Sequence, residues 1–171
     1  MRILYNCPEE ITSKISCGII HSYGVREWKL EETIKYYAAV VEVGKKILVE
    51  LPRPMILTNE WGKLDEWIEM VLYAFKNSIW GIVIFDEPEK PWGMERAVTL
   101  EQIRQAYNIM RKHTNLPSVI PSYSFWKWMF DSYLFGDFCD ILLYDEYFYG
   151  YGKTRWISPK WAFKWKLSLL K

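Results

Sequence analysis

Residues 80–89 read Trp-Gly-Ile-Val-Ile-Phe-Asp-Glu-Pro-Glu, an apolar run that ends abruptly on carboxylates and a proline. Four consecutive apolar residues at 82–85 are typical of a strand buried on both faces, as in a parallel sheet covered by helices. Pro88 has no backbone N–H to offer a neighbouring strand, so the strand is predicted to end before it. Asp86 and Glu87 are therefore expected at the carboxyl end of the strand, where α/β folds bind ligands and do chemistry. The alternative is that both acids are simply solvated there.

The composition is that of a globular domain with a near-neutral charge. A chain of 171 residues can bury a substantial core and is most simply one domain, residues 1–171. With 22 basic and 21 acidic residues, it lacks the basic surplus of a nucleic-acid-binding protein. Aromatic residues make up 18% of the chain, which indicates either a core or a binding cleft. Two histidines and no clustered thiols give no zinc pattern, and we expect neither a metal nor a cofactor.

The lengths of the apolar runs and the placement of the cysteines predict the cellular compartment of the protein. The first run reaches polar Asn6 too early for a signal peptide, and no apolar stretch approaches the ~18 residues that a bilayer span requires. The three cysteines are Cys7, Cys17 and Cys139. Their odd number, wide spacing and position in or beside apolar runs favour buried free thiols and a reducing compartment. We therefore expect a cytoplasmic protein.

Strand-like and helix-like segments alternate along the whole chain. The predicted strands are residues 3–7, 17–23, 46–51, 80–85, 117–123 and 140–147. Between them, helical spacing predicts helices at 30–43, 64–76 and 99–113, with a short aromatic helix at 125–134. After Pro52 and Pro54, a looser segment is expected through Trp61 and Gly62.

Each of the three longer helices has a predicted inward stripe, and the first and third also have a boundary signal. Gly44 is placed where the first helix would close, and Thr99 with Gln102 has the spacing of a capping box at the start of the third. The stripe of the first helix is Leu30, Ile34, Tyr37, Ala38 and Val41. That of the second is Leu64, Trp67, Ile68, Val71, Leu72 and Phe75, and that of the third is Leu100, Ile103, Ala106, Tyr107 and Met110.

The alternation predicts an α/β fold with parallel strands joined by right-handed crossovers. Neither a GxGxxG nor a GxxxxGK[ST] pattern occurs, so a nucleotide-binding doubly wound sheet lacks its main support. A TIM-barrel-like β/α repeat is the leading architecture. Such barrels have eight units and about 250 residues, so we expect an incomplete barrel of about six strands.

Landmarks in this order resemble the β/α-barrel glycoside hydrolases of clan A and their glycosidase-like relatives. They are Gly-Ile-Ile-His-Ser-Tyr at 18–23, Lys-Ile-Leu-Val-Glu-Leu-Pro at 46–52, Asp-Glu-Pro at 86–88, and Asp-Ile-Leu-Leu-Tyr-Asp-Glu-Tyr at 140–147. In that clan the fourth strand typically ends Asn-Glu-Pro and its Glu is the general acid/base, a position that Glu87 matches. Two features depart from the pattern: Asp86 stands where the clan has Asn, and the clan's nucleophilic Glu lies on a seventh strand, which we do not expect in this chain.

The resemblance implies a protein that acts on or binds a carbohydrate, with an O-glycosyl hydrolase as the possible enzyme. Cleavage needs two carboxyl groups across the scissile bond, and Asp145 is the strand-end acid best placed to face Glu87. We therefore predict Glu87 as acid and Asp145 as base. The predicted substrate-binding residues lie at strand ends: Asp86, His21, Tyr23, Glu50, Tyr123 and Tyr147. For the aromatic residues, packing inside the barrel is the alternative.

A second class of function is a non-catalytic partial barrel, which binds sugar or a protein partner or is one piece of a split enzyme. Its open strand edges would be covered by another copy of the chain or by a complementary barrel fragment.

Residues 147–171 form a basic, aromatic carboxy-terminal segment with six Lys or Arg, no acid and eight aromatic residues. Ser158-Pro159 is a good helix start, although apolar residues then alternate as in a strand; we favour a helix because the repeat predicts one. The segment could bind a membrane surface or a nucleic-acid backbone, or dock on the acidic remainder of the protein, which has 16 basic and 21 acidic residues.

Overall fold

A computed structural model describes residues 3–4, 18–21, 29–86, 88, 98–122 and 136–144. Its elements, in chain order, are β1 (Ile3–Leu4), β2 (Ile19–His21), α2 (Leu30–Glu42), β3 (Lys46–Glu50), α3 (Arg53–Leu57), α4 (Trp61–Phe75), β4 (Ile79–Val83), α5 (Leu100–His113), β5 (Ser118–Ser122), the 3₁₀ helix η1 (Gly136–Phe138) and β6 (Ile141–Tyr144). The predicted aromatic helix at 125–134 and the segment 147–171 lie outside the described residues.

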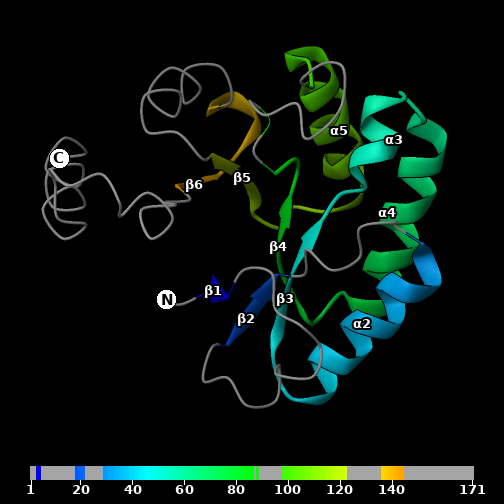
Figure 1. Cartoon of the computed structure of the whole chain (residues 1–171), viewed down its shortest axis with the longest axis vertical. Helices are drawn as coiled ribbons and strands as arrows, with labels where there is room; N and C mark the ends of the chain where they lie inside the picture. Colours follow the sequence, from blue (N-terminus) through cyan, green and yellow to red (C-terminus); the bar gives the residue numbers. More distant parts are fainter. Residues whose placement is uncertain are drawn as a thin grey trace, which may run out of the picture.

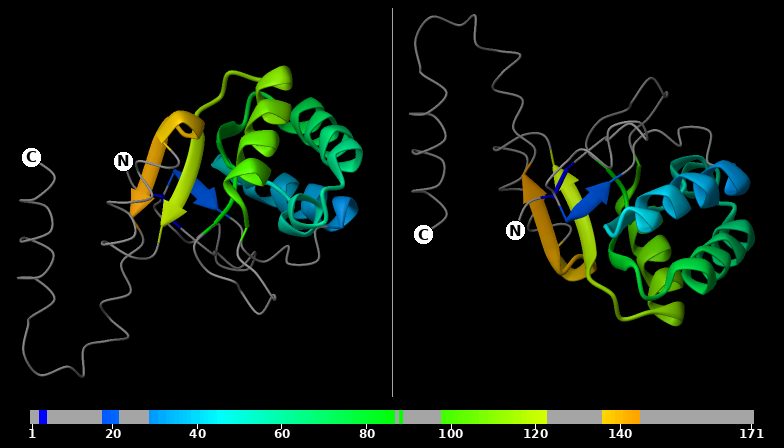
Figure 2. Two further views of the ribbon diagram at one scale, coloured as in Figure 1. Left: turned by 90° about the horizontal axis from the view of Figure 1, so that it is seen from above. Right: turned by 90° about the horizontal axis from the view of Figure 1, so that it is seen from below.

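The strands form one six-stranded sheet in which every pair is parallel and the spatial order equals the sequence order (Figure 1). A doubly wound sheet reverses its strand order at a switch point, and this sheet does not. The sheet curves, and α2, α3, α4 and α5 all lie on its convex side (Figures 1 and 2). The predicted α/β class with a TIM-barrel-like parallel β/α repeat is thereby confirmed.

Both faces of the sheet are buried. On the helix side, Ile47, Val49 and Ile82 belong to the main hydrophobic core together with the inner faces of α2, α4 and α5. On the other face, a second cluster is built from alternate residues of four strands: Ile19, Leu48, Val83 and Val119. This explains the uninterrupted apolar run at 82–85, because both sets of alternating side chains are covered.

The helices obey most of the boundary signals in the sequence. Gly44 follows α2 with φ 74°, a left-handed conformation that favours glycine. Thr99 and Gln102 make a reciprocal capping box at the start of α5. The predicted stripe of α4 is buried apart from Leu72, which is partly buried. Two stripe residues were predicted wrongly, because Ala38 of α2 and Leu100 of α5 are exposed.

The prediction of a looser segment after Pro52 was wrong. Residues 53–57 form α3, and α4 already begins at Trp61. Pro52 is the N-cap of α3 and Pro54 lies in its first turn, where the missing N–H would have no partner in any helix. The two prolines therefore begin a helix here, as well as ending the strand before it.

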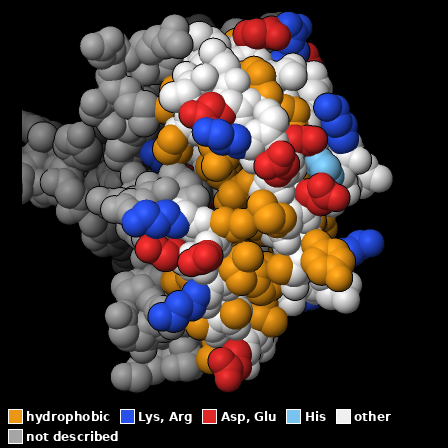
Figure 3. Space-filling model, turned by 90° about the vertical axis from the view of Figure 1, so that its right-hand side faces the viewer, with side chains coloured by type: hydrophobic (Ala, Val, Ile, Leu, Met, Phe, Trp, Pro, Cys, Tyr) orange, Lys and Arg blue, Asp and Glu red, His pale blue; other side chains and the backbone are white. Residues whose placement is uncertain are grey.

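The outer surface over the helices carries a band of hydrophobic side chains between charged groups (Figure 3). Met70 and Tyr73 of α4 are among the exposed large hydrophobic residues. None of the helices that the structure describes is both long and apolar enough to cross a membrane. Cys139 is a free, half-buried thiol whose pKa is raised to about 11, first by burial and then by the charge of Asp140.

Candidate functional site

Three predicted site residues lie at the carboxyl ends of three successive strands. His21 is the last residue of β2, Glu50 is the last residue of β3, and Asp86 follows β4 by three residues. Because the strands are parallel and in sequential order, these ends share one edge of the sheet. That edge is where β/α barrels place their chemistry.

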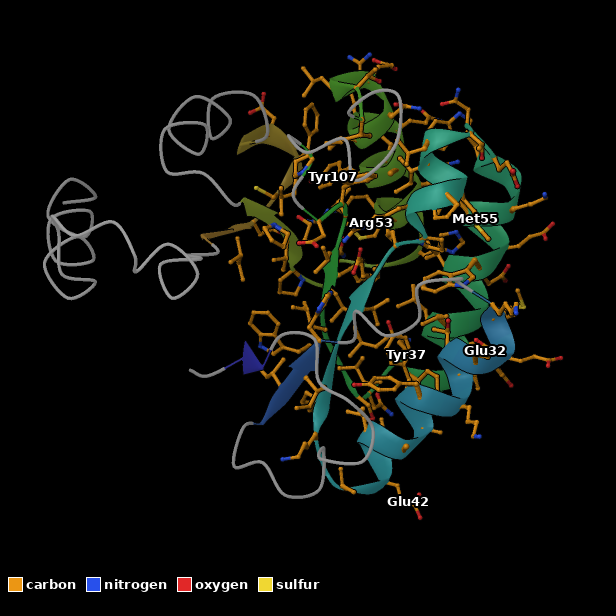
Figure 4. All side chains as sticks on the ribbon, in the orientation of Figure 1. Glu32, Tyr37, Glu42, Arg53, Met55 and Tyr107 are labelled. Atoms are coloured by element: carbon orange, nitrogen blue, oxygen red, sulfur yellow. The ribbon has the colours of Figure 1, made fainter. Side chains whose placement is uncertain are left out.

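A fourth residue, Arg53, labelled in Figure 4, pairs with both Glu50 and Asp86, and His21 joins the resulting buried ionic cluster through Glu50. Arg53 Nε donates to Glu50 Oε1 at 2.7 Å, and Arg53 Nη2 donates to Asp86 Oδ2 at 2.6 Å. His21 Nε2 lies 3.1 Å from Glu50 Oε2, a contact that is an ion pair when His21 is protonated. We call these four residues the strand-end cluster.

Local sequence explains why Arg53 reaches both carboxylates. Leu51 and Pro52 end β3 and turn the chain directly into α3, so Arg53 is only three residues from Glu50. Its guanidinium also lies 5.8 Å from the centre of the Phe85 ring, beside Asp86. A planar fork of donors can bind two carboxylates at once, which an ammonium group on a flexible stem does less well.

The strand-end cluster is almost completely removed from solvent. The exposed fraction is 0% for His21 and Glu50, 2% for Asp86 and 6% for Arg53. Buried charges are tolerated only when they are paired and hydrogen-bonded, and both carboxylates here bind the same guanidinium. With His21 protonated the four groups are formally neutral; with His21 neutral they carry one net negative charge.

Tyr37 of α2, labelled in Figure 4, belongs to the main hydrophobic core and interacts with Glu50 of the cluster. Burial raises the pKa of the Tyr37 phenol far above its ordinary value, and the negative charge of Glu50 acts in the same direction, whereas a backbone hydrogen bond at Glu50 opposes it. The phenol therefore stays protonated and adds no further negative charge next to Glu50.

The other predicted site residues lie outside the described residues: Glu87, Asp145, Tyr23, Tyr123 and Tyr147. Their roles stay predictions, as do the substrate-binding roles of His21, Glu50 and Asp86, which the structure places in contact with protein groups. Pro88, immediately after Glu87, is buried. Within the part of the chain that the structure describes, no group of three or more His, Cys, Asp or Glu residues could hold a metal ion.

Arg53 was missed by the sequence reasoning. The signal available was its spacing of three residues from Glu50, which places both charges within reach once the intervening Leu-Pro starts a helix. A single basic residue after a proline belongs to no helical or strand-like pattern, so the sequence gives no other signal for Arg53. Its role in the cluster depends on Asp86, which is 33 residues away in sequence and contacts Arg53 only in the folded protein.

A second polar network lies at the opposite end of the strands. Asp140 Oδ2 accepts hydrogen bonds from the Ser118 N–H at 2.8 Å and from Ser118 Oγ at 2.9 Å, and it pairs with Arg111 Nη2 at 2.5 Å. Arg111 also donates to the Leu116 carbonyl at 2.7 Å and lies over the Tyr107 ring. We call this the strand-start clamp; it ties the first residues of β5 and β6 to α5.

Comparison with known proteins places few constraints on the function. No family model matches the chain, and no curated protein matches it. Among solved structures, the chain is similar to a family 1 β-glucosidase from Thermotoga maritima, with a TM-score of 0.40 and 12% sequence identity. The similarity covers 68% of this chain and 36% of that one, so this chain spans little more than a third of the length of that enzyme.

Proposed function

We propose that this chain is a glycoside hydrolase-like protein that acts on or binds a carbohydrate at the carboxyl ends of its strands. One observation carries the proposal: His21, Glu50 and Asp86 come from three successive strand ends and meet in one buried cluster around Arg53. Buried ion pairs contribute little net stability compared with apolar packing, so such a cluster has a weak structural rationale. At the strand ends of a β/α repeat, it has a functional one.

In this proposal Glu87 is the general acid/base. It follows Asp86, whose carboxylate is bound by Arg53, and it precedes buried Pro88. Both neighbours of Glu87 are thus anchored to the protein. Glu87 gives its proton to the glycosidic oxygen as the bond from that oxygen to the anomeric carbon breaks.

Asp145 acts as the base in the same proposal. It takes a proton from the water whose oxygen forms the new bond to the anomeric carbon. This inverting arrangement needs roughly 6.5–9.5 Å between the two carboxyl groups, whereas roughly 5 Å would make the second carboxylate a nucleophile. Tyr23, Tyr123 and Tyr147 would stack on the sugar ring or bind its hydroxyl groups.

The experiment is a screen of aryl glycosides and polysaccharides with the wild-type protein and two variants. Glu87→Gln is expected to abolish hydrolysis, because the amide cannot supply a proton to the leaving oxygen. Glu69→Gln changes the same side chain on the exposed face of α4 and is expected to leave the rate unchanged. Equal rates for the wild type and Glu87→Gln would refute the role of Glu87.

The sheet edges favour a second candidate, a non-catalytic partial barrel that binds sugar or a protein partner or is one piece of a split enzyme. Among the described strands, β1 pairs only with β2, and β6 pairs only with β5. The same screen, together with a measurement of sugar binding by the wild type and Glu87→Gln, separates the candidates. Inactivity of the wild type on every substrate, together with sugar binding that Glu87→Gln does not weaken, would favour this second one.

A further inference from the structure

Arg53 is the first residue of α3, a helix that is too short to be stable without contacts from the rest of the protein. Helix α3 has five residues and no side-chain cap at its start. Helices this short are unstable on their own, because one or two backbone hydrogen bonds do not offset the cost of ordering the chain. What fixes α3 must therefore come from elements packed against it.

Ile56 of α3 is buried in the main core, and Gln102 of α5 supplies a polar contact to the end of the helix. Its Nε2 lies 3.0 Å from the Ile56 carbonyl oxygen, 3.2 Å from the Leu57 carbonyl oxygen and 3.0 Å from Asn59 Oδ1. These acceptors are at the carboxy-terminal end of α3, where the last carbonyls of a helix lack partners within it. The Gln102 side chain is 5% exposed, and α3 and α5 lie side by side (Figure 1).

The side-chain amide of Gln102 acts both as a donor, through Nε2, and as an acceptor, through Oε1. Its Oε1 accepts from the Thr99 backbone N–H at 3.0 Å and so completes the capping box of α5. Glutamate would serve that box equally well, because the box needs only an acceptor at this position. Only glutamine can also donate to the carbonyls of α3, which gives a physical reason for glutamine at position 102.

We propose that Gln102 is a positioning residue: by holding the end of α3, it sets where Arg53 presents its guanidinium to Glu50 and Asp86. The effect on catalysis rests on the proposed function, whereas the effect on Arg53 does not. The connection runs from the start of α5, through the end of α3, to the side chain that both carboxylates share.

The test compares Gln102→Glu with Gln105→Glu, which makes the same amide-to-acid change at a half-buried position of α5. Gln102→Glu keeps the acceptor for the capping box but turns a carboxylate oxygen toward three acceptors. The readout is solvent exchange of the Arg53 Nε–H proton in NMR spectra, assigned by its disappearance in Arg53→Lys. In the wild type we expect this exchange to be slow, because Nε donates to buried Glu50.

The expected result for Gln102→Glu is exchange of the Arg53 proton at least about tenfold faster, and a kcat lowered by roughly ten- to a hundredfold on any substrate found, because small displacements of catalytic groups have effects of this order. Gln105→Glu should change neither quantity. Unchanged exchange in a folded Gln102→Glu protein would overturn the proposal. Faster exchange with an unchanged kcat would support the positioning of Arg53 and would overturn its effect on catalysis.

Two further outcomes are decisive. If the wild type hydrolyses nothing in the screen while Gln102→Glu still speeds exchange, the positioning of Arg53 stands and the proposed hydrolase activity fails. If Gln102→Glu does not fold, Asn59→Gly replaces it: Asn59 has φ 60°, which glycine adopts freely, and the change removes one acceptor of the contact. Faster exchange in Asn59→Gly supports the proposal, and unchanged exchange overturns it.

Discussion

Arg53 is the residue on which the strand-end cluster depends, because its guanidinium is the cation that Glu50 and Asp86 share. Its hydrogen bonds to Glu50 and Asp86, at 2.7 and 2.6 Å, are shorter than a typical neutral hydrogen bond, as charge-assisted bonds are. The acids were recognisable in the sequence because they end apolar runs. Arg53 was not, because its partners come from two different strand ends and only the folded sheet brings them within reach of one side chain.

Replacing Arg53 is expected to destabilise the protein strongly. Arg53→Met keeps much of the side-chain volume but leaves two buried carboxylates without their shared cation, at a cost of about 3–5 kcal/mol in the free energy of unfolding. Arg104→Met on α5 is the matched control, because Arg104 also pairs with an acid three residues away but is exposed. An exposed pair of this kind contributes at most about 1 kcal/mol.

Urea unfolding at pH 7 measures both variants. The expected order of midpoints is wild type, then Arg104→Met slightly lower, then Arg53→Met far lower. Similar midpoints for the two variants would contradict the view that the Arg53 pairs are buried and strongly coupled.

At the scale of the elements, β4 is the strand that the sequence marks most clearly, and it is also irregular. Its register with β3 shifts between Ile47 and Leu48: Ile47 pairs with Ile79, whereas Leu48 pairs with Gly81. One extra residue, Trp80, is thus accommodated in β4, as in a β-bulge. The glycine beside it permits the close approach of β5.

Gly81→Ala tests that close approach. A Cβ at this position would lie 3.0 Å from the Pro117 carbonyl oxygen, which already accepts a hydrogen bond from the Ile82 N–H at 2.8 Å. Because this oxygen belongs to the backbone of β4's neighbour, it cannot move aside as a side chain could. We expect a loss of roughly 1–3 kcal/mol in the free energy of unfolding.

Gly62→Ala is the control with the opposite expected sign. Nothing lies within 4 Å of a Cβ at Gly62, which is in the first turn of α4. Alanine should therefore stabilise the helix by up to about 1 kcal/mol. Thermal unfolding of both variants measures the difference, and a Tm for Gly81→Ala at or above that of the wild type would show that the strand contact is not tight.

Helical spacing of apolar residues predicted the helices but not all of the residues that they bury. In α2 the spacing correctly marks Tyr37, but the buried set is Thr33, Tyr36, Tyr37 and Val40. Thr33 is buried because its hydroxyl donates to the Lys29 carbonyl within the helix, at 3.0 Å. A polar residue that is satisfied locally can face the core, and a hydrophobicity pattern does not register it.

For the whole molecule, the two ends of the sheet have different chemistry. The carboxyl ends hold the strand-end cluster, which is buried and joins His21, the neighbouring Glu50 and Arg53, and Asp86 from three parts of the sequence. The amino ends hold the strand-start clamp, in which Asp140 accepts from Ser118 and pairs with Arg111. In β/α barrels the first end is associated with activity and the second with stability. This agrees with the function proposed for the strand-end cluster, and it predicts a stabilising role for the strand-start clamp.

The clamp predicts a pH dependence of stability. Hydrogen bonds from the Ser118 backbone and side chain and from Arg111 hold the pKa of Asp140 below its ordinary value, although partial burial opposes this. Because the pKa is lowered in the folded state, the stabilisation is complete above the pKa of the unfolded chain. It is lost as the pH falls through the folded pKa.

Asp140→Asn should therefore lower the free energy of unfolding by about 1 kcal/mol at pH 7, a small value because the side chain is 52% exposed. The difference from the wild type should shrink as the pH falls below the ordinary pKa of an aspartate, near 4. Asp137→Asn, at an exposed position of η1, is the control. Denaturant unfolding from pH 7 to pH 3 measures both, and a difference that stays constant across this range would contradict the assignment.

The sequence by itself determined the fold class, the order of the strands and the position of most helices. These follow from local chemistry: apolar runs for doubly buried strands, helical spacing, Gly44 and the Thr99–Gln102 box as helix boundaries. It also placed Asp86 and Glu50 at strand ends. Such features depend on residues close together in the chain, so their signals can be read without a structure.

Only the tertiary structure decided which charges meet. The apolar run at 80–89 predicted acids at the end of β4, but not that Asp86 would be buried and bound by Arg53, nor that Gln102 would contact the helix carrying Arg53. These contacts join residues 33 and 46 positions apart. They form because the curved parallel sheet brings the carboxyl ends of successive strands together. No pattern among residues close in sequence predicts these contacts.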